Sequence, residues 1–288
     1  MRILLVPQGT YGDVRPLAAL GVALREAGHH VSFGVSPDHQ AWLQELGFDA
    51  HRVARFMEAP SDEADRAVGR PLKMLWAGLR FVMDLVPSQF ADLEPLLTET
   101  DLVVGSGLEF AGRSLAERRG IPYRFLCHVP TAIRSQFHPP VAIPFRPFPS
   151  WINRMLWWSN GVGTKLTFGR QIQAQRRRLG MAPIADLSEF LSTNIVMAAD
   201  AALAPIPSDC QLEFRTGYLA LEDGRSLSAE LETFLANGPV PIYLGFGSMA
   251  DPRPARTLSL LKALSQKRRL VVFNRRARRL CPEGIPNL

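Results

Sequence analysis

The segment from Pro7 to Pro16 combines the features of a ligand-binding turn. Its sequence, PQGTYGDVRP, follows a short apolar run and precedes an apolar pattern of helical period. Gly9 and Gly12 permit a tight turn and a close approach of a ligand. Asp13 stands at the expected helix start, where the positive helix end favours an ionised N-cap carboxylate that can accept a proton. The alternative is that Asp13 only caps the helix, because aspartate is a preferred N-cap.

A second glycine turn, GFGSM from Gly245 to Met249, stands between another apolar run and another helical pattern. Its backbone N–H groups and the Ser248 hydroxyl can cradle a diphosphate, although an ordinary turn between strand and helix is the alternative. The first turn is not the dinucleotide fingerprint, because its glycine spacing differs from G-x-G-x-x-G and no acid follows on the second strand. A dehydrogenase is therefore disfavoured.

Two further polar positions follow apolar runs. Ser106 and Gly107 end one expected strand, and His128 stands just past the next. Ligands collect at the carboxyl ends of strands, so both positions are candidates for binding. Turn geometry for the glycine and a structural hydrogen bond for the histidine are the alternatives.

A parallel α/β sheet is needed to bring these turns together, and the pattern of the chain predicts one. Short apolar runs alternate with segments of helical period, which is typical of a doubly wound sheet covered by helices on both faces. The expected strands are Arg2–Val6, His30–Val35, Leu102–Val104, Tyr123–Leu126 and Asn194–Ala198, and the expected helices are Val14–Ala27, Leu72–Val86, Glu109–Arg119 and Trp151–Leu179.

We expect two domains, residues 1–215 and 216–288. A polar stretch from Leu221 to Ser226 resembles a connection, and a second α/β unit begins after it. Its expected elements are a helix at Ala229–Leu235, a strand at Pro241–Phe246, a helix at Ala255–Gln266 and a strand at Leu270–Phe273. Because two expected strands are too few to bury both faces of a parallel sheet, we expect this second domain to be incomplete.

Composition excludes several classes of function. The net charge of +6 is concentrated in the segment from Arg253 to Leu288, where ten Lys and Arg accompany the single acid Glu283. Because no aromatic residue beyond Phe273 is interleaved with these cations, a nucleic-acid partner is not expected. The three cysteines are far apart, with no CxxC pair and no histidine cluster beside them at metal-ligand spacing, which predicts free thiols in a cytoplasmic protein without a metal or disulfides. No signal peptide or membrane span is expected either.

The first turn resembles the G-[ST]-R-G-D-V-x-P motif that opens the sterol, polyketide and glycopeptide glycosyltransferases of the UDP-glycosyltransferase, or glycosyltransferase family 28, type. The continuation Leu17–His29 is also similar to that family, as is Pro239–Met249. The two motifs stand in the family's order and more than 220 residues apart. The resemblance implies the GT-B fold, in which two Rossmann-like domains face a cleft.

The resemblance also implies a reaction, the inverting transfer of a hexose from a nucleotide diphosphate sugar to a hydroxyl. A UDP-sugar is the expected donor, and neither a metal nor a cofactor is implied. Asp13 matches the catalytic aspartate, which would take the acceptor proton. Thr10, Tyr11, Gly12, Gly247 and Ser248 match donor-binding positions, although Tyr11 replaces the usual arginine and so removes a cation.

The N-terminal domain of this family binds the acceptor, which draws attention to an aromatic segment. Seven of the 25 aromatic residues lie between Phe137 and Phe168, among several prolines. With Ser106 and His128, we take Phe137 and Trp151 as candidates for binding a lipophilic sterol, polyketide or terpenoid acceptor. Packing of a helix on the sheet is one alternative. Peripheral contact with a membrane surface, in which such acceptors dissolve, is another.

Complete members of the family continue with a segment of the form H-H-G-G-A-G-T, which holds the nucleotide and the sugar. No such run occurs in these 288 residues, which we interpret as a truncation within the second domain. We therefore expect little or no transfer activity from residues 1–288 alone. A non-catalytic acceptor-binding or accessory protein derived from a glycosyltransferase is the alternative function.

Overall fold

A computed structural model describes residues 1–55, 83–141, 143, 147–203, 205–222, 224, 226–247 and 254–274. The chain divides into two compact units, Met1–Leu221 and Glu222–Leu288, which we call unit 1 and unit 2. The division falls at the polar stretch that the sequence marks as a connection.

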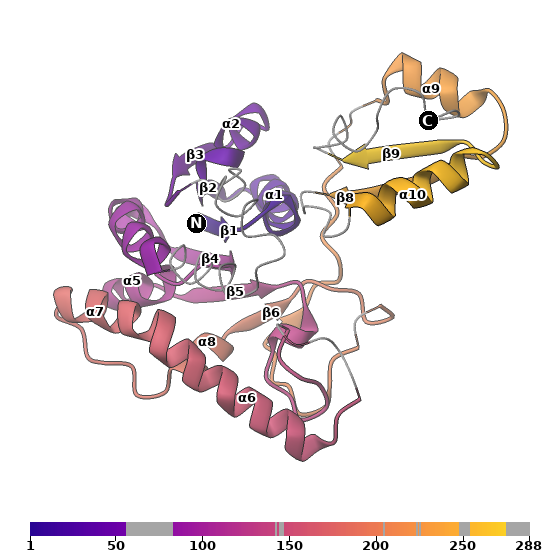
Figure 1. Ribbon diagram of the computed structural model, residues 1–288. Coiled ribbons are helices and arrows are strands. Elements are labelled where there is room, and N and C mark those ends of the chain that lie inside the picture. The colour runs from indigo at the N-terminus through magenta and orange to yellow at the C-terminus, as the bar shows by residue number, and fades with distance from the viewer. Residues whose placement is uncertain are drawn as a thin grey trace. The chain divides into compact units, whose positions relative to one another are not determined.

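Unit 1 is built on a seven-stranded sheet in the order β3-β2-β1-β4-β5-β6-β7 (Figure 1). Every neighbouring pair is parallel. The strands are β1 (Arg2–Gln8), β2 (His30–Val35), β3 (Asp49–Arg52), β4 (Leu102–Gly107), β5 (Tyr123–Cys127), β6 (Ile195–Met197) and β7 (Phe214–Arg215). The chain order reverses between β1 and β4, the topological switch point of a doubly wound sheet. The expected fold class is therefore confirmed.

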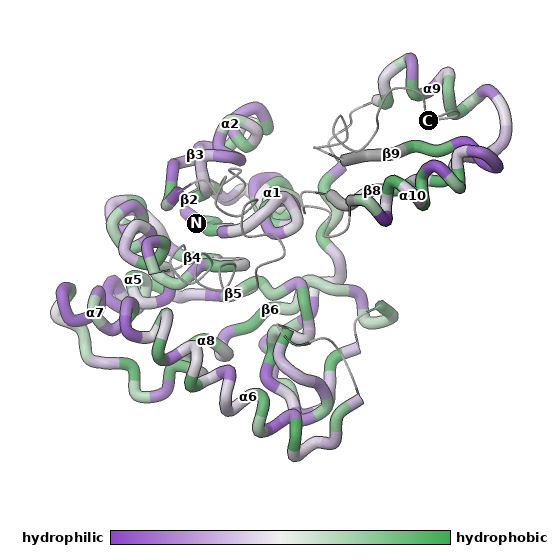
Figure 2. The backbone as a smooth tube through the Cα atoms, viewed as in Figure 1, coloured by the Kyte–Doolittle hydropathy of each residue, from purple (hydrophilic) through white to green (hydrophobic). Residues whose placement is uncertain are grey.

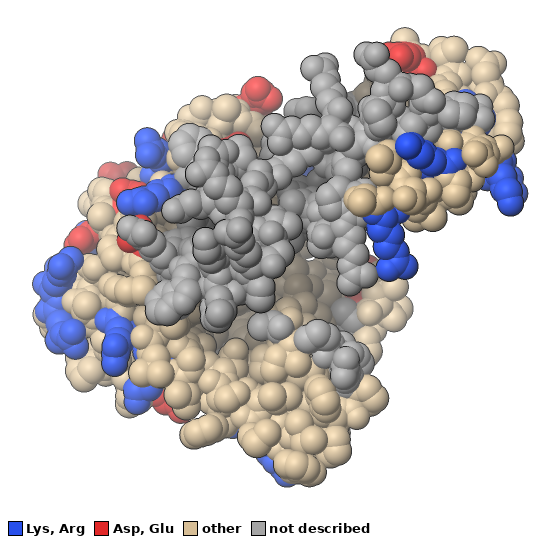
Figure 3. All heavy atoms as spheres, viewed as in Figure 1, with Lys and Arg blue, Asp and Glu red and all other residues tan. Residues whose placement is uncertain are grey.

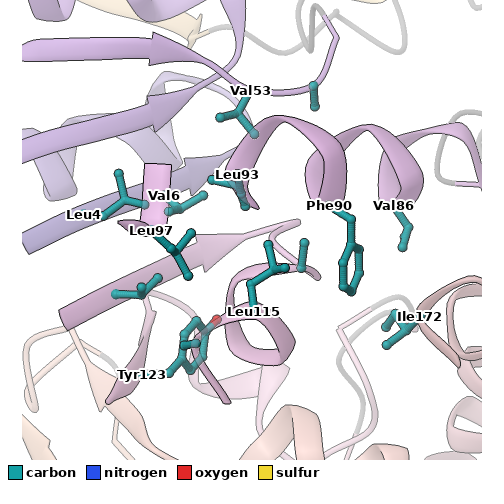
Figure 4. Close-up of a cluster of buried hydrophobic side chains, with 14 of the residues drawn as sticks. Leu4, Val6, Val53, Val86, Phe90, Leu93, Leu97, Leu115, Tyr123 and Ile172 are labelled. Carbon is teal, nitrogen blue, oxygen red and sulfur yellow. The ribbon is translucent and has the colours of Figure 1, made fainter. Parts of the chain in front are cut away.

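The core lies on both faces of this sheet because successive residues of a strand point to opposite sides. From β1, Ile3 and Leu5 join one buried cluster with Phe33. Leu4 and Val6 join the other, together with side chains such as Leu93, Leu97 and Leu115 (Figure 4). Burial on both faces explains why β1 is a continuous apolar run rather than an alternating one.

The helices of unit 1 are α1 (Tyr11–Glu26), α2 (Pro37–Glu45), α5 (Gly112–Arg119), α6 (Ser150–Thr164), α7 (Arg170–Arg178) and α8 (Leu187–Ser192). Residues 83–93 are also helical, whereas residues 72–82 of the helix expected at Leu72–Val86 lie outside the described residues. The expected long helix at Trp151–Leu179 is confirmed, because a π-helical turn, η3 (Lys165–Gly169), joins α6 to α7. Short 3₁₀ segments occur at η1 (Glu94–Glu99) and η2 (Pro130–Ala132).

Two helix starts differ from the sequence prediction. Helix α1 begins at Tyr11 rather than Val14, because Thr10 is the N-cap. Helix α5 begins at Gly112 rather than Glu109, because the Glu109 carboxylate accepts the N–H groups of Ala111 and Gly112 and so precedes the helix. In both cases the helix starts after a polar residue, Thr10 or Glu109, that accepts N–H groups at the start of the helix.

Unit 2 contains, within its described residues, α9 (Ala229–Ala236), β8 (Ile242–Gly247), α10 (Pro254–Ser265) and β9 (Leu270–Asn274). Strands β8 and β9 pair in parallel, as a strand, helix and strand unit requires. All four elements lie where the sequence predicts them.

Candidate active site

The turn between β1 and α1 holds Asp13 at the third position of the helix. The expectation that Asp13 is the N-cap is wrong, because Thr10 occupies that position. The Asp13 Oδ2 atom instead accepts the backbone N–H of Thr10 at 2.9 Å. Gly9 makes room for this arrangement, since a Cβ atom there would lie 2.0 Å from Asp13 Oδ2. The side chain is half-buried and lies next to the positive end of the helix.

This turn lies at the switch point of the sheet, where β1 and β4 end side by side. Gln8 pairs with Gly107, and the Leu108 N–H donates to the Gln8 carbonyl at 2.7 Å. Gly107 has a φ of 69°, and a Cβ atom there would lie 2.2 Å from the Gln8 oxygen and 3.4 Å from Asp13 Cγ. Only glycine fits this contact, which brings the end of β4 against the Asp13 carboxyl group.

Ser106 and His128 meet at the same edge of the sheet. Ser106 is fully buried at the end of β4, and its Oγ lies 3.0 Å from His128 Nε2, just past β5. Burial lowers the pKa of His128, and the charge of Asp13 partly opposes this effect. The imidazole is therefore neutral at pH 7. Its buried Nδ1 atom has no hydrogen-bond partner among the described residues.

A buried histidine on α2 contacts the same turn, and sequence reasoning did not identify it. His39 Nε2 donates to the Gly9 carbonyl at 3.2 Å. The Tyr11 ring packs edge-on against His39, with the ring centroids 4.6 Å apart, and is tilted against Trp42, with the centroids 5.3 Å apart. His39 and Trp42 are three residues apart on one helix face, a pattern that the sequence does not distinguish from ordinary core packing.

A buried acid, Glu109, follows two residues after Gly107. Glu109 Oε2 accepts the Tyr123 hydroxyl at 2.7 Å, and its other oxygen caps α5. Burial raises the pKa of Glu109, whereas its hydrogen bonds to Gly112, Tyr123 and Ala111 lower it. A cavity of 190 Å³ adjoins this pair, and its lining includes Gly107, Phe125 and Phe190.

The aromatic segment is anchored through a different set of residues. Asn153 donates to the carbonyl groups of Gln136 and Phe148, and the Trp157 indole donates to the His138 carbonyl at 2.9 Å. Phe137 is 55% exposed and Trp151 is 61% exposed. No contact within the described residues joins either of them to Asp13, Ser106 or His128.

The remaining predicted positions belong to unit 2. Gly247 is the last residue of β8, and Ser248 lies outside the described residues. Within the described part of the chain, no group of three His, Cys, Asp or Glu side chains could hold a metal ion. Nor is any helix there long and apolar enough to cross a bilayer.

Comparison with known proteins identifies relatives along nearly the whole chain. No protein-family model matches it. Glycosyltransferase GtfE of Amycolatopsis orientalis is 34% identical over 280 residues, which cover 94% of this chain and 67% of that protein. The chain belongs to the glycosyltransferase family. The chain is also 32% identical to the vancomycin aglycone glucosyltransferase of Amycolatopsis orientalis, over 94% of this chain and 67% of that protein.

Solved structures extend the comparison to the fold. The structure of the calicheamicin glycosyltransferase CalG4 superposes on this chain with a TM-score of 0.63 at 16% sequence identity. The match covers 99% of this chain and 68% of CalG4. The structure of SsfS6 of Streptomyces sp. SF2575 in complex with thymidine diphosphate matches with a TM-score of 0.54 at 19% sequence identity. The match covers 99% of this chain and 70% of SsfS6. These neighbours are GT-B glycosyltransferases, so the expected architecture is confirmed. The glycosyltransferase spans about two thirds of the length of the relatives it matches.

Proposed function

We propose that this chain binds a hydroxylated lipophilic acceptor in unit 1 and supplies Asp13 as the base for inverting sugar transfer. The observation that carries the proposal is the place of the Asp13 carboxylate at the switch point, where ligands bind in doubly wound sheets. Residues 1–215 form the acceptor domain in this proposal, and residues 216–288 begin the donor domain.

The proposed step moves one proton and exchanges one bond. Asp13 takes the proton of an acceptor hydroxyl as the oxygen attacks the anomeric carbon, and the nucleoside diphosphate leaves with the bonding electron pair. Its Oδ2 atom is held by Thr10, whereas Oδ1 has no hydrogen bond among the described residues and is the atom that we assign to the proton. A fixed carboxylate has little reorganisation to undergo during the reaction, which favours general-base catalysis.

The other candidate residues take roles around this carboxylate. Ser106 and neutral His128 contact the acceptor hydroxyl from the neighbouring strand ends, supported by their 3.0 Å pairing. Phe137 and Trp151 cover the lipophilic body of the acceptor, and the apolar lining of the 190 Å³ cavity beside Gly107 supports the same acceptor class.

We also propose which residues contact the donor. Thr10, Tyr11 and Gly12 form its contacts in unit 1, with Tyr11 fixed by His39 and Trp42 rather than offering a cation. In unit 2, we propose diphosphate contacts for Gly247, the last residue of β8, and for Ser248, which matches the same family motif.

Relatives and fold neighbours suggest which substrates to examine first. One relative is named as a dTDP-epi-vancosaminyltransferase and another as a vancomycin aglycone glucosyltransferase, and a fold neighbour binds thymidine diphosphate. Thymidine and uridine diphosphate sugars are thus the donors to test, with an aglycone of secondary metabolism as the acceptor. No metal or cofactor enters the proposed step. The cytoplasm is the proposed compartment, supported by the free thiols of Cys127 and Cys210.

A chimera tests the proposal in a complete enzyme. The aligned two thirds of GtfE would be replaced by residues 1–288 of this chain, and sugar transfer to an aglycone would be measured by mass spectrometry. We expect transfer by the chimera, and Asp13→Asn should reduce its rate by about 10²- to 10⁴-fold. Glu26→Gln, at the exposed end of the same helix, is the control and should leave the rate unchanged.

The outcomes distinguish a sugar transferase from a non-catalytic accessory protein. A folded chimera in which Asp13→Asn retains full activity would show that Asp13 is not the base. A chimera that binds the aglycone and the donor but transfers nothing would favour the accessory protein. Residues 1–288 alone should bind the aglycone with little or no transfer.

A further inference from the structure

Helix α6 and the π-helical turn η3 that continues it expose an apolar stripe. Trp151, Met155, Trp158, Val162 and Leu166 follow one another at intervals of three or four residues, which places them on one face of the helix. Their exposed fractions are 61%, 52%, 68%, 41% and 54%. Figure 2 shows apolar residues interleaved with polar ones along this helix. Single exposed apolar residues are common on surfaces, but a stripe of five with two tryptophans is not.

The opposite side of α6 is already packed. Asn153 is fully buried and donates to two backbone carbonyl groups, while the Trp157 indole donates to the His138 carbonyl. The helix is therefore held in place by its inner face. The interior of unit 1 does not need the outer stripe, and only its first residue, Trp151, is also an acceptor candidate.

The charged residues within 150–178 all have one sign. Residues 150–178 contain six Lys and Arg and no Asp or Glu. Only Arg176 points inward, where it forms a bidentate pair with Glu117 of α5. Lys165, Arg170 and Arg177 are exposed and form no ion pair among the described residues. Lys and Arg side chains gather over the α7 end in Figure 3.

A cavity of 680 Å³ lies along the flank of the same helix. Its lining combines Trp157, Trp158 and Val162 with the cations Arg134, Lys165, Arg170 and Arg177, and Asp186 is the one acid among the lining residues. Trp158 and Val162 belong to both the stripe and the cavity. Neither Asp13, Ser106 nor His128 lines it, so it is distinct from the proposed active site.

We propose that α6 docks unit 1 on an anionic phospholipid surface. An amphipathic helix with tryptophans on its apolar face and cations beside it lies in the plane of a bilayer, at the boundary of headgroups and acyl chains. The stripe enters this boundary. The flanking cations contact lipid phosphates, and the cavity receives one headgroup phosphate between Lys165, Arg170 and Arg134.

The charge pattern favours lipid over a protein partner. Basic segments are attracted to anionic leaflets, whereas protein interfaces deplete lysine at their centre. This inference does not depend on Asp13, because binding to lipid requires no sugar transfer. It would bring the protein to the phase in which a lipophilic acceptor dissolves.

Co-sedimentation of the 288-residue chain with vesicles tests the proposal. We expect binding to phosphatidylcholine vesicles that contain phosphatidylglycerol, and much weaker binding to phosphatidylcholine alone or at high salt. Lys165→Ala and Arg170→Ala should each weaken binding about fivefold. Trp158→Ser should weaken it by about tenfold or more.

Matched controls address general effects of substitution. Arg119→Ala, an exposed cation on α5, and Leu203→Ser, 86% exposed in a loop, should leave lipid binding unchanged. Far-UV circular dichroism checks that each variant folds. The proposal fails if the folded chain does not bind anionic vesicles. It also fails if the Lys165, Arg170 and Trp158 variants bind vesicles as strongly as the control variants. It also fails if sedimentation shows a dimer that the Trp158→Ser change dissociates, since a second copy would then cover the stripe.

Discussion

Replacing Gly9 with alanine should displace the Asp13 carboxylate while leaving the fold intact. The new Cβ atom would lie 2.0 Å from Asp13 Oδ2 and 2.5 Å from Cγ. Real Cβ contacts do not fall below 3.0 Å, so the carboxylate must move by at least about 1 Å. The hydrogen bond from the Thr10 N–H, now 2.9 Å long, cannot survive that movement.

Two opposing contributions keep the change in stability small. Loss of a helix-capping interaction costs about 1 kcal/mol. Replacing glycine by alanine restricts the unfolded chain, which contributes about 0.4–1 kcal/mol in the other direction. The free energy of unfolding should therefore change by less than about 1 kcal/mol, whereas a 1 Å misplacement of a reacting group costs about 10²-fold in rate.

Urea unfolding of the chain and sugar transfer by the GtfE chimera measure the two quantities. Asp13→Asn is the comparison, because its amide oxygen can still accept the Thr10 N–H although it is no longer a base. Gly163→Ala, on α6 where an added Cβ meets nothing within 4 Å, controls for the substitution itself and should stabilise the helix. The reasoning is refuted if Gly9→Ala transfers sugar within about threefold of the parent chimera while Asp13→Asn does not.

Two further predictions concern acids of unit 1, the buried Glu109 and the exposed Glu117. Tyr123→Phe should lower the free energy of unfolding by about 1–3 kcal/mol in urea titrations, because the buried Glu109 Oε2 atom loses its 2.7 Å donor; an unchanged value would contradict this. Hydrogen bonds from Arg176 lower the pKa of Glu117 below its ordinary 4.5. The contribution of this pair to the free energy of unfolding is therefore complete above pH 4.5 and is lost as the pH falls through the lowered pKa. The stability difference between the parent and Glu117→Gln should consequently shrink below pH 4.5, and a pH-independent difference would rule out this linkage.

The sequence predicts the central strands well because burial on both faces leaves an unmistakable apolar run. Residues such as Leu4 and Phe33 belong to these runs. The edge strands were missed for the complementary reason. Strand β3 (Asp49–Arg52) is short and polar, and β7 (Phe214–Arg215) has only two residues, so neither carries a pattern that differs from a loop. Their pairing depends on the neighbouring strand.

The candidate site was predictable only in part. The positions of Asp13, Ser106 and His128 at strand ends follow from chain order and the parallel sheet, and these three side chains do gather at the switch point. His39 could not be found in this way. Its role as a donor to the Gly9 carbonyl depends on how α2 packs over the turn, which is a tertiary contact without a local signal.

The space around Asp13 helps to separate a catalytic from a purely capping role. Capping requires only that Oδ2 accept the Thr10 N–H. It does not explain why β4 ends against the same carboxyl group, with Gly107 at a φ of 69° and in a position where any side chain would strike the Gln8 carbonyl. A strand end brought so close delivers Ser106, and through it His128, to one side of the carboxylate. That convergence of three strand ends on one half-buried acid supports the proposed role of Asp13 in proton transfer, because a helix cap alone does not need it.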